Sequence, residues 1–487
     1  MEFNFHSGDI RFMSPQFSLL SHSQIKDLHF ASLEILERTG VRVDHPGVRK
    51  LLSDRGASVC EKTNIVKIPP PIVEWAIQMA PSKVTIYDRS GKIKLRLEGH
   101  RVYFGAVSDI FYIIDQYTGK PVKCTREHLP SILKVIDALE NIDFVNPSGC
   151  VQEVPPEITN LISLKDALMG TAKPLIWEPR SLKELKQGIS LCEIAAGNRK
   201  NLSEKPFLII YCEPISPLVH IKEALDCLFL AGEYRLPIIY TPMSIGGETA
   251  PVTLAGNLAI CNAEALSGIV IAQLIREGLP CIYGGIPGPM DMRTAIFPYA
   301  SPESVLLCAA LTEMAHYYNL PMFGTAGVTE AVEVDCQAAS EITLNCILAL
   351  LSGANLVHNV GLTAGGKGVS IEVIIMANEI IEMCRRSLQG IDTDEDLLAL
   401  DVIDTVGPGG NFITQDHTVK HCRKIWSPKL FQRMDIGRWL DNPQHLSEII
   451  HHKLQQIIST HRTIELEDKI TRQLQKMEEI WWREYKL

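Results

Sequence analysis

The clearest pattern along the chain is a repeated unit: a short apolar run, a polar or glycine-rich break, and a longer stretch with helical spacing. The runs are apolar at successive positions rather than at alternate ones, which is typical of parallel strands buried on both faces. Seven runs begin between residues 144 and 354, and DVIDTVGPGG from residue 401 is a weaker eighth. The seven are FVNPSGCV (144), PLIWEP (174), FLIIYCEPISP (207), LPIIYTPMSIGG (236), LPCIYGGIPGP (279), LPMFGTAG (320) and ANLVHNVG (354).

Eight strands that alternate with helices predict an α/β fold. Closure of the strands into a (β/α)8 TIM barrel is the simplest arrangement. An open, doubly wound sheet is the alternative, but no GxGxxG turn follows the first run, so a nucleotide-binding sheet has little support.

The two ends of the chain differ from this repeat. Residues 23–40 place apolar side chains at helical spacing and end in Gly40, and residues 83–105 indicate a hairpin that turns at residues 89–91. The last residues are rich in helix formers with charge pairs four apart. We therefore expect an N-terminal α+β extension (1–105), a (β/α)8 barrel catalytic domain (106–440) and a C-terminal helical segment (441–487).

Charge and cysteine content narrow the class of protein. The 47 basic and 57 acidic residues give a net charge of −10, which argues against a nucleic-acid surface. Thirteen scattered cysteines without a CxxC pair are typical of reduced thiols in the cytoplasm. No secretory signal is recognisable, and the most apolar stretch, residues 265–275, is shorter than the roughly 20 residues of a membrane span. We expect a cytoplasmic homo-oligomer with no membrane or nucleic-acid partner.

The residues that follow the apolar runs are the candidates for chemistry, because the active site of such a barrel lies where its strands end. Their rings and carboxylates would suit a quaternary ammonium ligand. The alternative is that the tyrosines only close the barrel mouth. The predicted substrate-binding residues at these strand ends are Trp177, Tyr211, Glu213, Tyr240, Tyr283 and Asn359.

His358 ends the run LVHNVG and is the candidate catalytic residue. The competing interpretation is that its imidazole only satisfies a buried carbonyl group. Glu372 is a further substrate-binding candidate, although a structural role for it and for Glu379, seven residues later, is equally open. Asp335, Gln337 and Glu341 are expected to organise the loop after the run at 320 rather than to perform chemistry.

No metal site is predicted. His417 and His421 have the spacing of one helical face, but neither an HExxH motif nor a thiol pair accompanies them. No GxSxG motif and no P-loop is present, so ordinary hydrolase and kinase chemistry has no support.

Five segments in order resemble the trimethylamine methyltransferase family, in its branch without pyrrolysine. The resemblance runs nearly from end to end, and the chain carries only standard residues. The segments are LHFASLEILERTGVRVDHPGVRKLLSDRGASV, APVTLAGNLAICNAEALSGIVIAQLI, YASPESVLLCAALTEMAHYYNLPMFGTAG, LLSGANLVHNVG and ALDVIDTVGPGGNFITQDHTVKHCR.

This resemblance implies a barrel enzyme that passes a methyl group from a methylated amine to the Co(I) corrinoid of a separate small protein. Branch members without pyrrolysine are associated with quaternary amines such as glycine betaine, proline betaine, carnitine and γ-butyrobetaine. The cobalamin is expected on the partner, because this chain has no recognisable DxHxxG module. No metal is expected to be bound by this chain.

The resemblance also implies a functional histidine at position 358, which could donate a hydrogen bond to a betaine carboxylate. Gly365, Gly366, Gly409 and Gly410 are the candidate contacts to the corrinoid, although a tight turn explains the last two nearly as well. Glu213 and Glu248 depart from the family pattern. A carboxylate facing the pocket would repel a betaine carboxylate and favour a substrate with a hydroxyl group or a second cation.

Two alternatives stay open. One is a zinc-dependent corrinoid methyltransferase of the methanol or thiol type. The other is a barrel that binds betaine without turnover.

Overall fold

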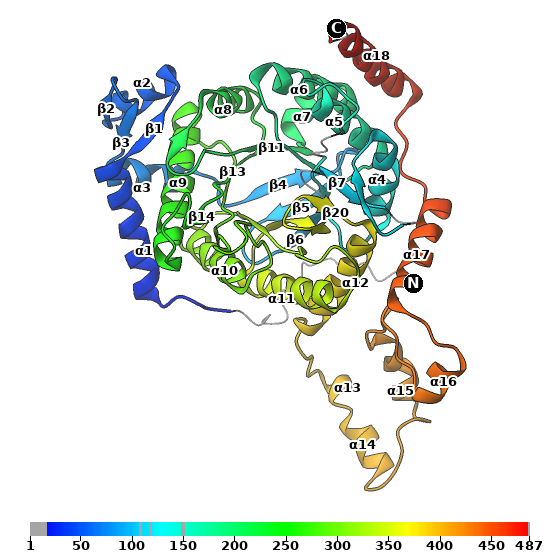
Figure 1. Ribbon diagram of the computed structural model, residues 1–487. Helices are drawn as coiled ribbons and strands as arrows, with labels where there is room; N and C mark the ends of the chain where they lie inside the picture. The colour runs from blue at the N-terminus through cyan, green and yellow to red at the C-terminus, as the bar shows by residue number, and fades with distance from the viewer. Residues whose placement is uncertain (1–16, 107–109, 116–117, 148–150, 486–487) are drawn as a thin grey trace.

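A computed structural model describes residues 17–106, 110–115, 118–147 and 151–485 of the chain. Eight parallel strands close into a barrel, and each pairs with the next barrel strand along the chain (Figure 1). This arrangement confirms the predicted (β/α)8 fold. The strands are β6 (Tyr103–Ala106), β9 (Phe144–Val145), β10 (Leu175–Trp177), β11 (Leu208–Cys212), β13 (Ile238–Tyr240), β15 (Cys281–Gly284), β17 (Met322–Thr325) and β18 (Leu356–Val360).

Helices surround these strands and follow them in chain order. They are α4 (Leu129–Ala138), α5 (Thr159–Gly170), α6 (Leu182–Ala196), α7 (Arg199–Glu204), α8 (Lys222–Tyr234), α9 (Leu254–Ile275), α10 (Pro302–Tyr317), α11 (Cys336–Ser352) and α12 (Ile371–Ser387). Short strands also lie in the loops. One four-stranded sheet contains β19 (Leu362–Thr363), β20 (Gly368–Val369), β7 (Tyr112–Ile114) and β8 (Pro121–Lys123), and β14 (Ile245–Gly246) pairs with β16 (Gly288–Pro289).

The eighth barrel strand is not the run at residue 401. That segment is helix α14 (Leu400–Val406), in which aspartates at 401 and 404 interrupt the apolar residues, and aspartate is depleted in strands. The missing strand is β6, which pairs with β18 on one side and β9 on the other. The barrel therefore begins at residue 103, three residues before the expected first residue of the barrel domain.

The predicted hairpin is confirmed as β4 (Val84–Tyr87) and β5 (Ile93–Leu97). It closes the N-terminal end of the barrel, where the backbone N–H of Tyr87 donates to Pro206 O at 2.9 Å and that of Arg89 to Ala172 O at 2.9 Å. Its apolar side chains join one buried cluster with side chains from the barrel lumen. The opposite, C-terminal end is left for a site.

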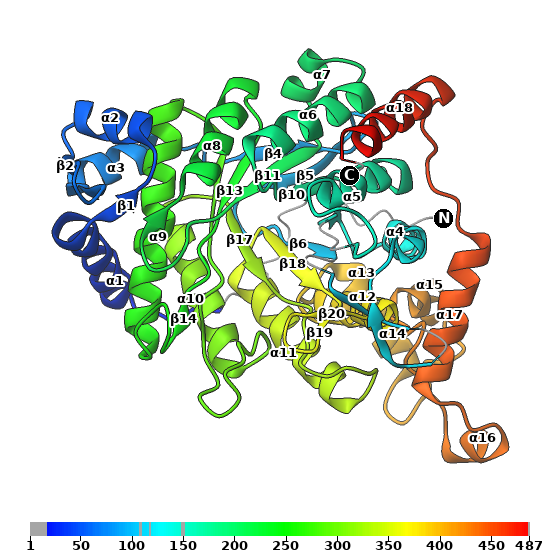
Figure 2. The ribbon, with the colours of Figure 1, turned by 45° about the horizontal axis from the view of Figure 1, so that its top comes forward.

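The N-terminal extension covers the outer side of α9 (Figure 2). It contains α1 (His22–Glu34), a π-helical turn (Ile35–Thr39), β1 (Val41–Val43), α2 (Pro46–Asp54), β2 (Ser58–Cys60), β3 (Ile65–Lys67) and α3 (Pro70–Met79). Strand β1 also pairs with β12 (Val219–His220), which lies in the loop between β11 and α8. Barrel and extension therefore share a sheet.

Helix α9 is longer than its apolar stretch suggested. It is the one helix in the described residues that is long and apolar enough to cross a membrane, and 83% of its most apolar window is buried. The barrel covers one side of α9, and α1 and α3 cover the other. The helix can be apolar all round because both of its faces are packed against protein.

The C-terminal part begins with an arm that leaves the barrel after α12 (Figure 1). The arm holds α13 (Glu395–Leu398), α14, α15 (Asp416–His421), a 3-10 turn (Cys422–Lys424) and α16 (Ile436–Asp441). Helix α17 (Leu446–Thr460) then packs on α4 and α12, and α18 (Asp468–Glu484) packs on α5 and α6. Glu478 of α18 forms ion pairs with Arg126 and Lys165, which fixes α18 to the barrel.

Large side chains between strands and helices fit because two helical glycines face them. A methyl group at position 268 of α9 would lie 2.0 Å from Cδ1 of Tyr240, and one at 188 of α6 would lie 2.3 Å from the ring of Trp177. No Cβ atom can occupy either place, so the two rings need these glycines.

We predict that Gly268→Ala lowers the free energy of unfolding by about 1–3 kcal/mol, because the added methyl overpacks the Tyr240 contact. Urea denaturation measures the change. In a Tyr240→Val background the same substitution should cost much less. An equal cost in both backgrounds would show that the contact is not the cause.

Candidate active site

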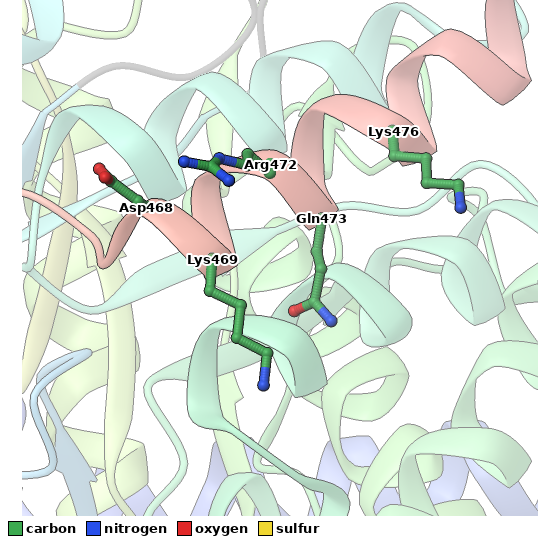
Figure 3. A pocket seen from close by; sticks show the side chains of 5 residues that line it. All are labelled: Asp468, Lys469, Arg472, Gln473 and Lys476. Atoms are coloured by element: carbon green, nitrogen blue, oxygen red, sulfur yellow. The ribbon is translucent and has the colours of Figure 1, made fainter.

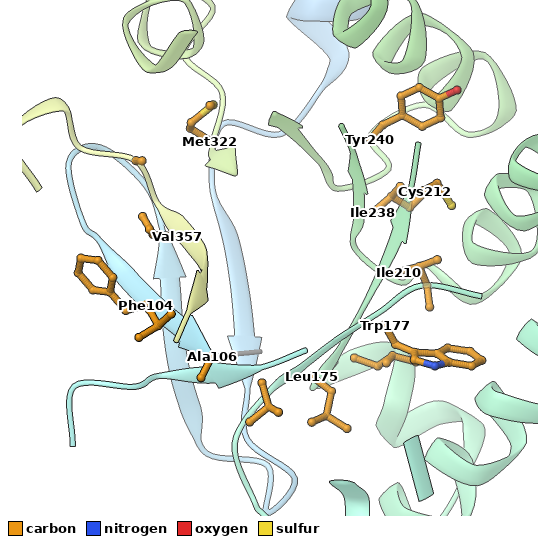
Figure 4. Close-up of a cluster of buried hydrophobic side chains, with 14 of the residues drawn as sticks. Phe104, Ala106, Leu175, Trp177, Ile210, Cys212, Ile238, Tyr240, Met322 and Val357 are labelled. Atoms are coloured by element: carbon orange, nitrogen blue, oxygen red, sulfur yellow. The ribbon is translucent and has the colours of Figure 1, made fainter. Parts of the chain in front are cut away.

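The alternation of side chains along each strand decides which residues face the barrel lumen. Ile176, Tyr211 and Phe323 belong to the buried cluster that fills the lumen above the hairpin. The neighbours of these residues belong to a second cluster, between the strands and the helices. Figure 4 shows members of this outer cluster, with Trp177 and Tyr240 directed toward the surrounding helices.

Three of the rings that the sequence predicted in the pocket therefore lie outside it. Trp177 packs against α6, the hydroxyl of Tyr240 hydrogen-bonds Nδ1 of His220 at 2.5 Å, and the hydroxyl of Tyr283 donates to Asn262 of α9 at 2.6 Å. All three side chains are fully buried in the helical layer. Successive side chains of a strand point to opposite faces. The strand ends were identified correctly, but in each of these three strands the ring lies on an outward-facing residue.

Tyr211 and Glu213 lie on the lumen side. The Tyr211 hydroxyl donates to Oε2 of Glu213 at 3.1 Å, and its ring meets Phe323 edge to face at 5.8 Å between centroids. Glu178 follows Ile176 by two residues, as Glu213 follows Tyr211, so both carboxylates continue inward-facing rows of adjacent strands. Both are half-buried. Glu178 directly follows Trp177 at the end of the run at 174, although it is not among the predicted substrate-binding residues.

His358 lies inside the mouth but is a neutral imidazole. Its ring stacks on Phe323 at 4.3 Å, and Nδ1 lies 2.7 Å from the carbonyl oxygen of Gly324. Burial lowers the pKa of His358 to about 4, although the bond to this carbonyl opposes the shift. Nδ1 must carry the proton to donate to the carbonyl, which leaves Nε2 as an acceptor. The side chain does satisfy a buried carbonyl, and in this state its Nε2 cannot donate to a carboxylate.

Asn359 has a left-handed backbone, with φ at 77°, which directs its side chain differently from a regular strand residue. Nδ2 donates to Oγ1 of Thr325 at 3.1 Å. Oδ1 is buried and has no hydrogen-bond partner among the described residues. The same holds for Asn146 Oδ1 and Thr241 Oγ1, which follow other barrel strands, and for Thr363 Oγ1 in β19; none of the three is among the predicted substrate-binding residues.

Buried polar atoms without partners are rare, and a ligand or water is the usual explanation. Asn146 and Thr241 directly follow β9 and β13, and Asn359 belongs to β18. These atoms therefore belong to the same end of the barrel as Tyr211 and His358. Their position directly after an apolar run was the available sequence signal, since Thr241 follows one as closely as Glu213 does.

Glu372 is not a pocket residue. It lies in the first turn of α12, and its Oε1 is 3.0 Å from Nδ1 of His451 in α17, so it joins two outer helices. Glu379 is structural as well, because its Oε1 accepts the backbone N–H groups of residues 429–431 at 2.9 to 3.0 Å. Glu248 lies exposed in the turn after β14.

The loop after β17 is organised as predicted. Asp335 caps α11 by accepting from the backbone of Ala338 at 2.8 Å. Glu341 accepts from Thr329 Oγ1 at 2.6 Å and from the backbone of Glu330 at 2.8 Å.

The four predicted corrinoid-contacting glycines separate into two places. Gly365 and Gly366 form the turn between β19 and β20, with φ values of 64° and 77°. A methyl group at Gly366 would lie 2.5 Å from the ring of Tyr299, in the loop between β15 and α10, so this turn belongs to the mouth. Gly409 and Gly410 lie between α14 and α15 in the arm, apart from the strand ends (Figure 1).

A hollow beside α18 does not contribute to this site. Its lining comes from one exposed helix with mostly cationic side chains, which gives it neither enclosure nor rings (Figure 3). Its lining residues are Asp468, Lys469, Arg472, Gln473 and Lys476. The described residues contain no group of three or more His, Cys, Asp or Glu side chains that could hold a metal ion, and no disulfide links the described cysteines.

Comparison with known proteins decides the family. A sequence model of the trimethylamine methyltransferase (MTTB) family matches residues 4–481. The chain belongs to this family. The family and the methyltransferase class expected from the five segments are thus confirmed.

Two relatives illustrate the range of substrates in the trimethylamine methyltransferase family. The chain is 33% identical over 420 residues to a trimethylamine methyltransferase MttB of Desulfitobacterium hafniense, covering 86% of this chain and 85% of the relative. It is 28% identical over 466 residues to a glycine betaine methyltransferase of another strain of that species, covering 95% and 96%. The crystal structure of the hydroxylamine MtmB complex has the same fold, with a TM-score of 0.50 and 12% identity over 89% of this chain and 92% of the other.

We predict that His358→Gln reduces the loss of stability in acid. Folded His358 stays neutral down to about pH 4, whereas the unfolded residue binds a proton below about pH 6.5. This group therefore contributes stability that is present at pH 7 and is lost as the pH falls. Between pH 7 and 5 the free energy of unfolding should fall by about 2 kcal/mol less in His358→Gln than in the wild type.

Chemical denaturation at both pH values measures this difference. His452→Gln, an exposed position on α17, is the matched control and should leave the difference between the two pH values unchanged. If His358→Gln and the wild type lose the same stability, His358 is not held in the neutral form.

Proposed function

We propose that this chain transfers a methyl group from a quaternary ammonium substrate to the corrinoid of a partner protein. The observation that carries the proposal is the combination at the barrel mouth of the Tyr211 ring, the carboxylates of Glu178 and Glu213, and a neutral His358. Carboxylates and ring faces attract a quaternary ammonium, which offers no N–H for a hydrogen bond. Family membership supports the reaction, and the glycine betaine methyltransferase among the relatives supports the substrate class.

The chemistry agrees with a neutral histidine. A quaternary ammonium that loses a methyl group leaves as a neutral tertiary amine, which needs no proton. Near neutral pH the His358 ring carries one proton, which it donates to the Gly324 carbonyl. It has no second proton to transfer. A neutral His358 is therefore sufficient for this substrate class, whereas a leaving group that must be protonated would need a general acid.

The residues of this chain would act mainly by positioning. The corrinoid supplies the reduced cobalt that accepts the methyl group. Glu178 and Glu213 attract a positive charge that disappears during the reaction, so their effect belongs to substrate binding rather than to the transition state. The Tyr211 ring and the stacked Phe323 and His358 rings restrict the orientation of the ammonium head.

The partner protein would approach at the rim of the mouth. Exposed apolar side chains project from three of the loops that follow barrel strands, and the Gly365–Gly366 turn lies beside one of them. Exposed apolar groups next to a site are typical of protein docking surfaces. The rim residues are Ile215, Val252, Leu254, Met292 and Ile296, between 39% and 71% exposed.

A choline-like amine is a second candidate substrate beside glycine betaine. Glu213 lies on the lumen side, and its charge would repel the carboxylate of a betaine while accepting a hydrogen bond from a hydroxyl group. The cytoplasmic location stays a prediction.

A substrate panel tests the proposal. Purified protein is mixed with Co(I) cobalamin or a corrinoid protein and with glycine betaine, proline betaine, carnitine, γ-butyrobetaine, choline or trimethylamine, and methyl-Co(III) is followed by absorbance. At least one quaternary amine should be demethylated. Conversion of trimethylamine alone would contradict the proposal, tight binding without methyl transfer would favour a non-catalytic barrel, and activity that depends on stoichiometric zinc would favour the zinc-dependent alternative.

We predict that Glu213→Gln raises KM for the active amine about tenfold and raises kcat by a similar factor, so that kcat/KM changes by no more than about twofold. The lost attraction is about 1.4 kcal/mol of binding, and it acts on the ground-state cation. Steady-state kinetics measures both constants. Glu248→Gln, in an exposed turn after β14, is the control and should change neither. A large fall in kcat with unchanged KM would place Glu213 in the transition state instead.

A further inference from the structure

Thr241 carries a buried hydroxyl group that has no hydrogen-bond partner among the described residues. The side chain is fully buried and directly follows β13. A buried hydroxyl group that makes no hydrogen bond costs free energy, so a ligand or a water molecule is expected beside it. The transfer of the methyl group itself does not use this hydroxyl.

The alternation along β13 directs the Thr241 side chain into the lumen. Ile239 belongs to the cluster that fills the lumen and Tyr240 to the outer cluster, so the next residue faces inward again. The backbone N–H of Thr241 donates to the carbonyl oxygen of Cys212 at 3.1 Å, which continues the pairing of β13 with β11 by one residue. The hydroxyl group therefore lies at the C-terminal end of the barrel, in the mouth.

Gly284 of β15 borders this hydroxyl group on one side. It follows Ile282 of the lumen cluster by two residues, so position 284 also faces inward. A methyl group at this position would lie 3.0 Å from Oγ1 of Thr241 and 3.1 Å from Cβ of Phe323. The glycine therefore leaves the hydroxyl group uncovered by a side chain from β15.

Glu213 borders the hydroxyl group on the other side. Cys212 pairs with Tyr240 in register, so the residues that follow them, Glu213 and Thr241, lie on adjacent inward-facing rows about 4.8 Å apart. The Glu213 carboxylate accepts from the Tyr211 hydroxyl at 3.1 Å. A threonine hydroxyl can donate a hydrogen bond and an ionised carboxylate can only accept one, so the two side chains offer a ligand one donor and one acceptor.

The inward-facing residues at seven strand ends include no lysine or arginine. Each of them lies two residues after a member of the lumen cluster. A substrate carboxylate would meet the charges of Glu178 and Glu213 with no cation from these positions to offset them. A hydroxyl group carries no charge, and it can accept one hydrogen bond and donate another. The seven residues are Asn146, Glu178, Glu213, Thr241, Gly284, Thr325 and His358.

We propose that Thr241 is a specificity-determining residue that selects a quaternary amine with a hydroxyl group on a short tail, such as choline. The Thr241 hydroxyl donates to the oxygen of the tail, and the hydroxyl of the tail donates to the Glu213 carboxylate. The ammonium head lies against the Tyr211 ring, one residue position away on the neighbouring strand. This inference rests on the proposed function and adds to it the recognition of the tail that does not react.

Four amines that differ only in the tail test the preference, with methyl transfer to Co(I) as the readout. They are choline, its n-propyl analogue, in which a methyl group replaces the hydroxyl, its methyl ether, which can accept but not donate, and glycine betaine. The wild type should have a kcat/KM for choline at least about tenfold above that for each of the others. Equal or better use of glycine betaine would overturn this inference alone. No transfer from any quaternary amine would overturn the proposed function and this inference with it.

Thr241→Val removes the hydroxyl group and keeps the shape of the side chain. It should raise KM for choline about tenfold and leave kcat within about twofold, because the bond to the tail is the same in the ground state and the transition state. The constants for the n-propyl analogue should not change. Thr241→Ser should keep the wild-type preference. Thr85→Val, at an exposed position of β4 at the closed end of the barrel, is the matched control and should change none of these constants.

A purely structural role of the Thr241 hydroxyl gives a different result. Because this hydroxyl has no partner among the described residues, Thr241→Val should keep or raise the free energy of unfolding measured without substrate. An equal loss of kcat/KM for choline and its n-propyl analogue would overturn the proposal. A lower free energy of unfolding in Thr241→Val with an unchanged KM for choline would overturn it as well.

Discussion

In a closed barrel of eight short strands, only every second side chain of each strand can face the lumen, and the account of the site depends on this constraint. The alternation directs Ile176, Tyr211 and Phe323 inward and sends Trp177 and Tyr240 into the helical layer. The outward rings are accommodated because Gly188 and Gly268 leave room on the facing helices. The same constraint extends the inward rows to Glu178 and Glu213. The composition of the mouth thus follows from the phase of the strands.

Closure of the other end gives the mouth its environment. The β4–β5 hairpin fills the N-terminal end of the barrel with apolar side chains, and Phe323 carries that apolar layer up to His358. A histidine between a phenyl ring and a backbone carbonyl loses the hydration that would stabilise its charged form, which keeps it neutral. In this neutral form the ring offers no positive charge to the nearby carboxylates.

The fold could be predicted from the sequence to a large extent, because continuous apolar runs and helical spacings depend on local patterns. Seven of the eight strands and the β4–β5 hairpin have such patterns. The eighth strand, β6, was missed because its short apolar run closely follows the hairpin and was assigned to it. The phase of the strands could not be predicted, since a run that is apolar at every position contains no alternation to show which residues face inward. That is why Tyr283 was expected in the pocket, although its hydroxyl group donates to Asn262 in the helical layer. The pairing of Glu372 with His451 joins helices 79 residues apart, and no local pattern reveals it.

A crystal structure of the protein with the quaternary amine that the panel identifies is the most direct test of the central claim. The ammonium head should lie against the ring of Tyr211, within about 6 Å of its centre, with the carboxylates of Glu178 and Glu213 on the same side and the His358 ring beside it. An ammonium bound away from the strand ends, or a mouth in which Trp177 and Tyr240 rather than Tyr211 surround it, would contradict the account.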